Sequence, residues 1–266
     1  MKILFFGDVV GKIGRRALAQ TLPELKATQK PDLVIANVEN LAHGFGVTVD
    51  TLTELDKAGV DFFTSGNHIF DNKSYPEVFA DPHFRERILR PANYPLGSPG
   101  RGQAVLPTGA GNALVINLMG RVFFKQQFDD PFRMLEAILR DQAAETLAAI
   151  VVDFHAEATS EKVCFGWHAA GRVSAVLGTH TQVATADWRL LPGGTAYVTD
   201  VGPVAGRDGV IGFQKEGPLQ GFLSQMPTHF EVLEKGTTEV NGVLITVDPA
   251  TRQAIAIEKI YREVTI

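Results

Sequence analysis

The chain is short of cysteine and of long apolar runs. Cys164 is its only cysteine among 266 residues, which excludes an intrachain disulfide and a cysteine-based zinc site. No apolar run approaches the roughly 18 residues that a membrane-spanning helix needs. The N-terminal apolar run is too short for a secretory signal and is followed by Asp8. We therefore expect a cytoplasmic protein.

The chain also lacks an excess of positive charge. Its 25 Lys and Arg against 30 Asp and Glu leave a net charge of −5, which argues against a general nucleic-acid coat. A small phosphorylated substrate remains compatible, because a bound cation reverses the local sign of the potential. We expect a small phosphodiester or nucleotide as ligand, no membrane partner and no stable nucleic-acid complex. Two-fold self-association is the default for the oligomeric state.

Short apolar runs alternate with helix-like segments over the first two hundred residues, which is typical of parallel βα units. Continuous apolar runs suit strands that are covered on both faces. We expect strands over residues 2–6, 32–38, 62–66, 103–106, 113–118, 148–154 and 173–177, and helices over residues 13–29, 49–58, 132–144 and 160–169. The Pro- and Gly-rich stretch 91–102 is expected to be a loop.

The last third of the chain changes character. β-type residues separated by turns predict hairpins over residues 195–198, 230–233, 243–247 and 254–261. No repeat, low-complexity tract or linker interrupts the chain, so we expect one domain over residues 1–266. Parallel units followed by antiparallel strands favour an α/β (α+β) fold with a two-sheet core flanked by helices.

Metal-binding residue types recur where the predicted strands end. The positions are Asp8, Glu39 with Asn40, Asn67 with His68, His155 and His180. Because the carboxyl ends of parallel strands meet at one edge of a sheet, these side chains are expected to converge. Taken singly, an Asp or Asn after a strand is more often a turn or capping residue. Five such sites in succession favour a metal centre.

The mixture of carboxylate, amide and imidazole also indicates which ion is bound. It suits Mn, Fe or Zn better than an oxygen-only Ca site. A catalytic centre fits better than a structural one, because a metal lowers the pKa of a bound water towards about 7. A phosphate-binding turn at Asp8, with Gly11 and Gly14 before a helix, is the rival explanation. The spacing does not form a dinucleotide fingerprint.

The ordered set of motifs resembles the calcineurin-like metallophosphoesterases. The motifs are Gly7-Asp8-Val9-Val10-Gly11, Val38-Glu39-Asn40, Gly66-Asn67-His68, Asp153-Phe154-His155, Gly178-Thr179-His180-Thr181 and Thr199-Asp200-Val201-Gly202. The Glu-Asn pair and the Gly-Asp-Val-Val-Gly start are similar to the YmdB-like bacterial branch. The resemblance covers nearly the whole chain, and it implies a four-layer αββα sandwich of two mixed β-sheets flanked by helices.

The same resemblance implies a binuclear phosphodiesterase, a hydrolase acting on 2′,3′-cyclic nucleotides. Asp8 and Asn40 would serve the first metal, Glu39 would bridge both, and Asn67, His155 and His180 would serve the second. A hydroxide bridging the two metals would attack phosphorus, and His68 would act as general acid. Asp8, Glu39 and this hydroxide would leave a surplus of roughly one positive charge, which suits a singly charged diester.

One position departs from the family pattern. Members usually carry Gly-Thr-His-Thr-His, whereas this chain has Gln182 at the last position. An amide oxygen binds metal more weakly than an imidazole, so we expect two divalent ions with unequal affinity. Iron or manganese is expected at the nitrogen-rich site, and the weaker, all-oxygen site would also tolerate Mg. His43, soon after Glu39, is a candidate substrate-binding residue or a solvated loop histidine.

Two other functions remain open on the sequence alone. A phosphomonoesterase or nucleotidase would use the same metal pair. A regulatory or scaffold protein that keeps the fold without turnover is the alternative outside enzymes. The presence of both Asn67 and His68 favours an enzyme, because non-catalytic relatives generally lack metal ligands or the acid histidine. Gln182, which replaces a usual histidine, favours the scaffold.

Overall fold

Two six-stranded mixed sheets pack face to face in the computed structural model, which describes residues 1–142 and 144–266. The first sheet has the order β10-β11-β1-β2-β3, with β12 pairing β11. Its strands are β1 Lys2–Phe6, β2 Leu33–Asn37, β3 Phe62–Thr64, β10 Val204–Gly206, β11 Thr237–Val247 and β12 Ala254–Thr265. Strands β1, β2 and β3 are parallel, and β11 is antiparallel to its three neighbours.

The second sheet has the order β4-β5-β6-β7-β9-β8. Its strands are β4 Gln103–Thr108, β5 Gly111–Met119, β6 Leu147–His155, β7 Ala175–Thr179, β8 Arg189–Leu191 and β9 Thr195–Val198. The four central strands are parallel, and the edge strands β4 and β8 are antiparallel to their neighbours.

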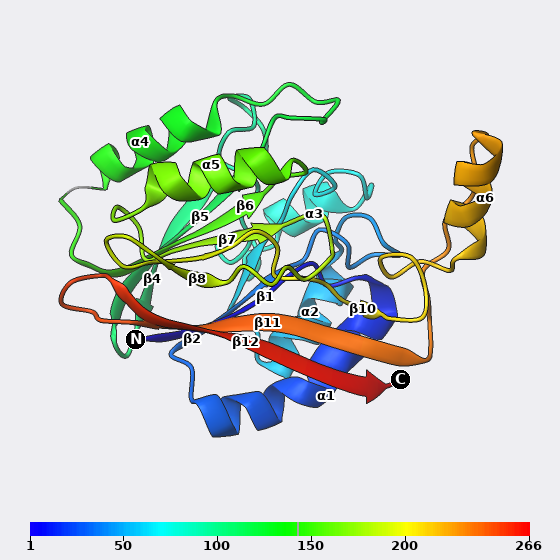
Figure 1. Ribbon diagram of the computed structural model, residues 1–266, viewed down its shortest axis with the longest axis horizontal. Helices are drawn as coiled ribbons and strands as arrows, with labels where there is room; N and C mark the ends of the chain where they lie inside the picture. The colour runs from blue at the N-terminus through cyan, green and yellow to red at the C-terminus, as the bar shows by residue number, and fades with distance from the viewer. Residues whose placement is uncertain (143) are drawn as a thin grey trace.

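Helices cover the outer face of each sheet (Figure 1). Helices α1 Gly11–Gln29 and α2 Val49–Ala58 lie on the first sheet, and α4 Pro131–Asp141 and α5 Thr159–Ala169 lie on the second. The short helix α3 Tyr75–Ala80 follows β3, and α6 Glu216–Ser224 projects from the side of the molecule. The four-layer αββα architecture expected from the sequence is therefore confirmed.

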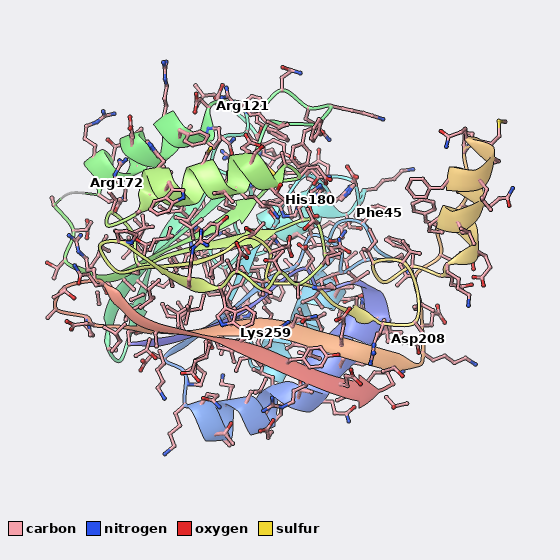
Figure 2. The ribbon with its side chains drawn as sticks, in the orientation of Figure 1. Phe45, Arg121, Arg172, His180, Asp208 and Lys259 are labelled. Carbon is pink, nitrogen blue, oxygen red and sulfur yellow. The ribbon has the colours of Figure 1, made fainter. Side chains whose placement is uncertain are left out.

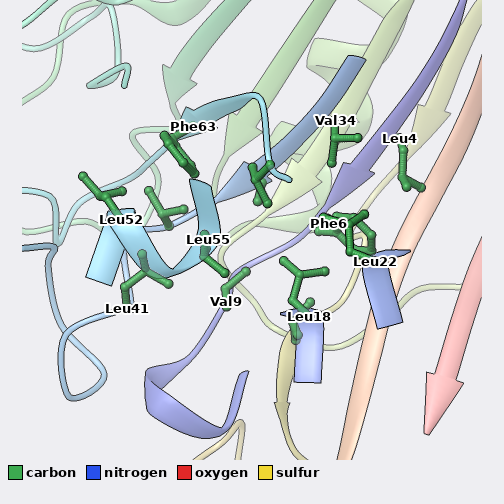
Figure 3. Close-up of a cluster of buried hydrophobic side chains, with 14 of the residues drawn as sticks. Leu4, Phe6, Val9, Leu18, Leu22, Val34, Leu41, Leu52, Leu55 and Phe63 are labelled. Atoms are coloured by element: carbon green, nitrogen blue, oxygen red, sulfur yellow. The ribbon is translucent and has the colours of Figure 1, made fainter. Parts of the chain in front are cut away.

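Alternation along each strand divides the core into layers, because successive side chains point to opposite faces. Leu4 and Phe6 of β1 pack with Leu18 and Leu22 of α1 (Figure 3), whereas Phe5 faces the other sheet. This central layer between the sheets is apolar along most of the strands. Within each sheet the parallel strands run towards the same edge, where their carboxyl ends collect.

Most predicted elements agree with the structure to within a few residues. Residues 230–233 lie outside any strand, and Val232 makes only an isolated bridge to Phe213, so the hairpin predicted there is wrong. Helix α4 ends at Asp141 rather than 144, and residue 143 of that prediction lies outside the described residues. Pro23 lies within α1, and the helix nevertheless continues to Gln29, although a proline inside a helix usually kinks or ends it. The single-domain assignment stays a prediction.

Candidate metal centre

Each candidate ligand lies at or just after the carboxyl end of a strand. Asp8 comes after β1, Glu39 and Asn40 after β2, Asn67 and His68 after β3, His155 ends β6, and His180 and Gln182 follow β7. Because the two sheets face each other, these ends meet where the apolar layer between the sheets reaches the surface. Figure 2 shows His180 and Phe45, which lie on this edge.

Three ligand atoms lie close to the buried ring of His155. Its Nε2 lies 3.0 Å from Glu39 Oε1, 3.1 Å from His180 Nδ1 and 3.2 Å from Asn67 Oδ1. Adjacent ligands of an octahedral ion with bonds of about 2.1 Å stand about 3.0 Å apart. The ligand atoms of Glu39, His155 and His180 also all lie within 4.8 Å of one another. The spacing fits a divalent cation held among these four side chains.

Some buried acceptors at this edge lack partners. Among the described residues, Asp8 Oδ1 and Gln182 Oε1 are buried without a hydrogen bond, and Glu39 Oε1 is buried with the ring of His155, 3.0 Å away, as its ion-pair partner. The other carboxylate oxygens are satisfied by backbone donors, since His180 N donates to Asp8 Oδ2 at 2.9 Å and His68 N to Glu39 Oε2 at 3.0 Å. A buried unpaired carboxylate oxygen is costly unless a cation neutralises it. The donor set therefore fits bound metal.

Asn40 and Gln182 form the other side of the cluster. Gln182 Nε2 donates to Asn40 Oδ1 over 3.3 Å, and Asn40 Nδ2 donates to the Gly44 carbonyl at 2.8 Å. The side chains of Gln182 and Asn40 are nearly buried, at 8% and 2% exposure. Asp8, Asn40 and Gln182 offer only oxygen atoms as ligands, and the weaker metal site predicted for them stays a prediction.

The charges at this edge shift one another's pKa. Burial, with Glu39 and Asp200 nearby, raises the pKa of Asp8 to about 8, although His155 acts against this. Burial disfavours charge on His155, but Glu39 and the other carboxylates around it outweigh this effect and raise its pKa to about 9. Burial and the neighbouring His155 lower the pKa of His180 to about 3. Burial acts to raise the pKa of Glu39, and the adjacent imidazoles lower it to about 2.

A second layer of polar contacts orients the histidines. His155 Nδ1 lies 2.8 Å from Thr179 Oγ1, which donates to Asp153 Oδ1 at 2.6 Å. Asp153 is fully buried and accepts further hydrogen bonds from Asn37 and Thr64 of the first sheet. His180 Nε2 lies 2.9 Å from Glu157 Oε2. Such partners fix which ring nitrogen is presented to a metal.

The loop that carries His180 and Gln182 is strained and is held by a buried ion pair. His180 and Gln182 adopt positive φ values of 95° and 56°, which non-glycine residues rarely do. Lys162 Nζ, on α5, donates to the Thr179 carbonyl at 2.7 Å and to Asp200 Oδ2 at 2.8 Å. Asp200 also accepts from the backbone N–H and hydroxyl of Thr181. The pair therefore holds the backbone on either side of His180.

His68 and His43 lie in different surroundings. His68 Nδ1 contacts Asp71 Oδ2 at 2.6 Å, and its ring packs edge-on against Phe45. His68 lines a pocket of about 400 Å³ together with Asn67 and His180. His43 is exposed and lines hollows formed with residues 232–234, so the structure does not bring it into this pocket. Its role in substrate binding stays a prediction.

The sequence analysis quoted Asp153 and Thr179 within motifs but gave them no role, and it missed the supporting residues Asn37, Thr64 and Lys162. A usable signal exists, because residues two apart in a strand share a face. One such face of β6 points towards the other sheet and carries Val151, Asp153 and His155. Along this face the side chains change from apolar to ionisable towards the end of the strand. Lys162 lies within α5, and no local pattern marks it.

The chain is similar to known proteins along almost its entire length. The family model described as "YmdB-like protein" matches residues 4–260. A protein of Bacillus subtilis (strain 168) named "2′,3′-cyclic-nucleotide 2′-phosphodiesterase" is 44% identical over 260 residues, covering 98% of this chain and 96% of that protein.

Solved structures agree with this match. A crystal structure of a hypothetical protein from Thermus thermophilus has a TM-score of 0.91 and 38% identity, and covers 99% of both chains. A crystal structure of a novel phosphatase from Mycoplasma pneumoniae has a TM-score of 0.91 and 34% identity, and covers 99% of this chain and 93% of that one. None of the helices in the described parts of the chain has the length and apolar character to cross a membrane. The chain belongs to the YmdB-like family.

Proposed function

We propose that the chain is a metal-dependent phosphodiesterase that hydrolyses 2′,3′-cyclic nucleotides. The observation that carries the proposal is the convergence of buried carboxylates with His155 and His180, next to a pocket that His180 and His68 line. Its volume of about 400 Å³ falls in the range of small-molecule sites. The name of the Bacillus subtilis relative supports the choice of substrate.

The residues divide into two ligand groups. Asn67, His155 and His180 would hold one divalent ion, iron or manganese, through two imidazoles and an amide. Asp8, Asn40 and Gln182 would hold a second ion, Mg included, through oxygens alone. Glu39, with one oxygen beside His155, would lie between the groups. Bound ions of this kind polarise phosphoryl oxygens and lower the pKa of bound water.

His68 would act as the general acid. Its Nδ1 is engaged by Asp71, which leaves Nε2 as the proton donor. As water adds to phosphorus and the bond to the ribose 2′ oxygen breaks, Nε2 would give its proton to that oxygen. The product is then a nucleoside 3′-monophosphate. Phe45 packs against the ring and restricts its rotation.

The proposed activity is tested directly by comparing substrates. Protein loaded with Mn should hydrolyse 2′,3′-cyclic AMP to the 3′-monophosphate and stop there, because the site carries a charge surplus suited to a diester. Initial rates on 2′,3′-cyclic AMP, 3′-AMP and p-nitrophenyl phosphate give the comparison. Faster turnover of both monoesters would instead identify a phosphomonoesterase, and absence of turnover with every metal would favour a non-catalytic protein.

Replacing the proposed acid should separate chemistry from metal binding. We expect His68→Ala to keep its bound metal, measured by elemental analysis, while kcat falls about 10²–10⁴-fold. His83→Ala is the matched control, because His83 is an exposed histidine that contacts Asp56 away from the centre. Unchanged turnover in His68→Ala would remove this residue from the mechanism.

The amide at position 182 should set the affinity of the weaker site. Gln182→His supplies an imidazole in place of the unpartnered Oε1, and we expect it to tighten Mn binding at that site about tenfold. Gln182→Ala should weaken the same site and leave the His155 group unchanged. Calorimetric titration of Mn into metal-free protein measures both affinities. Two equally tight sites in the unaltered protein would contradict the asymmetry.

Metal-free protein should become less stable as pH rises. Folding holds protons on His155 and Asp8, with pKa values of about 9 and about 8 against ordinary values of 6.5 and 3.8. The folded state therefore binds more protons than the unfolded state at pH 7, and this stabilisation, on the order of 1 kcal/mol per pH unit, is lost towards pH 9. Glu39 and His180 titrate below this window.

Cations replace these protons, so metal-loaded protein should not show the decline. Melting temperatures of chelator-treated and loaded protein at pH 7 and 9 provide the measurement. Asp8→Asn is the control variant, and it should retain only the part of the decline that comes from His155. A metal-free melting temperature that stays level between these pH values would contradict the expectation.

A further inference from the structure

An exposed phenylalanine stands at the rim of the pocket. Phe123 lies in the loop between β5 and α4 (the green loop beside α4 in Figure 1) and is 82% exposed. Its φ is 71°, a left-handed value that a bulky residue rarely adopts. The same pocket is lined by Asn67, His68 and His180. An unfavourable backbone geometry thus presents an aromatic face to solvent beside the metal ligands.

Buried contacts fix the start of this loop. Both oxygens of Glu161, a residue of α5 that is 9% exposed, accept from the backbone N–H of Arg121, and Oε2 also accepts from that of Val122. A Cβ at Gly120 would lie 2.6 Å from Glu161 Oε2, so the close approach requires glycine. Arg121 also contacts Asp130, which lies at the other end of the loop. The position of Phe123 is therefore set by its anchors.

The next residue connects the loop to the metal centre. The ring of Phe124 lies 4.9 Å from that of His180 and 5.9 Å from that of Phe128. Phe124 is thereby engaged in packing, whereas Phe123 leaves its face open. A phosphodiester held at the ligands of this pocket would place the remainder of the molecule towards the rim that Phe123 forms.

We propose that Phe123 is the stacking surface for the nucleobase of the substrate. The inference rests on the proposed function, because it assigns the cyclic phosphate to the metals and the base to the rim. Aromatic stacking accepts any base, since every base has a π-face. The site then takes purine and pyrimidine nucleotides alike, with tighter binding of the larger purine ring.

The test compares two five-membered cyclic diesters, both built on a ribose, that differ in having a base. Phe123→Ala should raise KM for 2′,3′-cyclic AMP about tenfold, the effect of one lost stack, with kcat within about twofold because ground and transition states lose the contact equally. Ribose 2′,3′-cyclic phosphate, which keeps the sugar but has no base, should be hydrolysed at an unchanged rate. Phe222→Ala is the matched control, since Phe222 is 78% exposed on α6 and does not line the pocket.

Two kinetic outcomes would overturn the proposal. Equal loss on both diesters would make Phe123 a residue that shapes the loop, and no loss on either would exclude contact with the base. Phe123→Trp gives a measurement that does not depend on turnover. A base stacked on the introduced tryptophan should quench its fluorescence when 2′,3′-cyclic AMP is added. Phe222→Trp should show no quenching.

The same experiments separate this proposal from the proposed function. If the unaltered protein hydrolyses neither diester, the phosphodiesterase assignment fails, and quenching in Phe123→Trp still decides whether the base stacks there. If both diesters are hydrolysed but the quenching is absent, the stacking surface fails and the activity stands.

Discussion

The site depends on one buried carboxylate that joins the two sheets. Asp153, on β6, accepts from Asn37 and Thr64 of the facing sheet and from Thr179 of the neighbouring strand. Three hydrogen bonds compensate for burying this charge, and a buried donor left without its acceptor costs about 1–3 kcal/mol. Because Thr179 also contacts His155, the network that closes the polar end of the core also orients the central histidine. Fold stability and ligand geometry are thus set by the same atoms.

A single helix positions both loops that frame the pocket. Consecutive residues of α5, Glu161 and Lys162, are buried and charged; Glu161 holds the backbone at Arg121, and Lys162 holds the backbone at Thr179. Positive φ values occur in both loops, and strained residues of this kind cost about 1–3 kcal/mol each. Such strain persists only where surrounding contacts determine the conformation, which the Lys162–Asp200 pair does for the His180 loop. Through these two contacts, helix α5 on the outer face of the sheet fixes the loops that surround the candidate site.

The sequence was informative where structure follows from local pattern. The strand over residues 2–6 and the helix over residues 49–58 have the predicted bounds, because apolar runs and capping residues define them locally. Polar residues that follow parallel strands converge because the carboxyl ends of these strands meet at one edge of the sheet. This can be inferred from the order of elements without knowing any distance. Helix α6 was not predicted, because Gly217, Pro218 and Gly221 interrupt the helical pattern of its sequence. Pro218 is its only buried residue, so the helix packs little against the rest of the molecule. The roles of Asp153 and Lys162 depend on neighbours 17 to 116 residues away, which no window of sequence contains.

The two proposed ligand groups differ in how their polar atoms are already satisfied. Asn40 and Gln182 already share a hydrogen bond, so their amides satisfy part of each other's polarity. Around His155, Glu39 Oε1 lies 3.0 Å from the ring Nε2, and the neighbouring carboxylates raise the pKa of His155 to about 9 against the effect of burial. A cation there takes the place of the His155 proton beside these carboxylates and meets nitrogen donors, which the amide group does not offer. The His155 group should therefore fill first, and occupancy of the amide group should follow at higher metal concentration, with Glu39 coupling the two events.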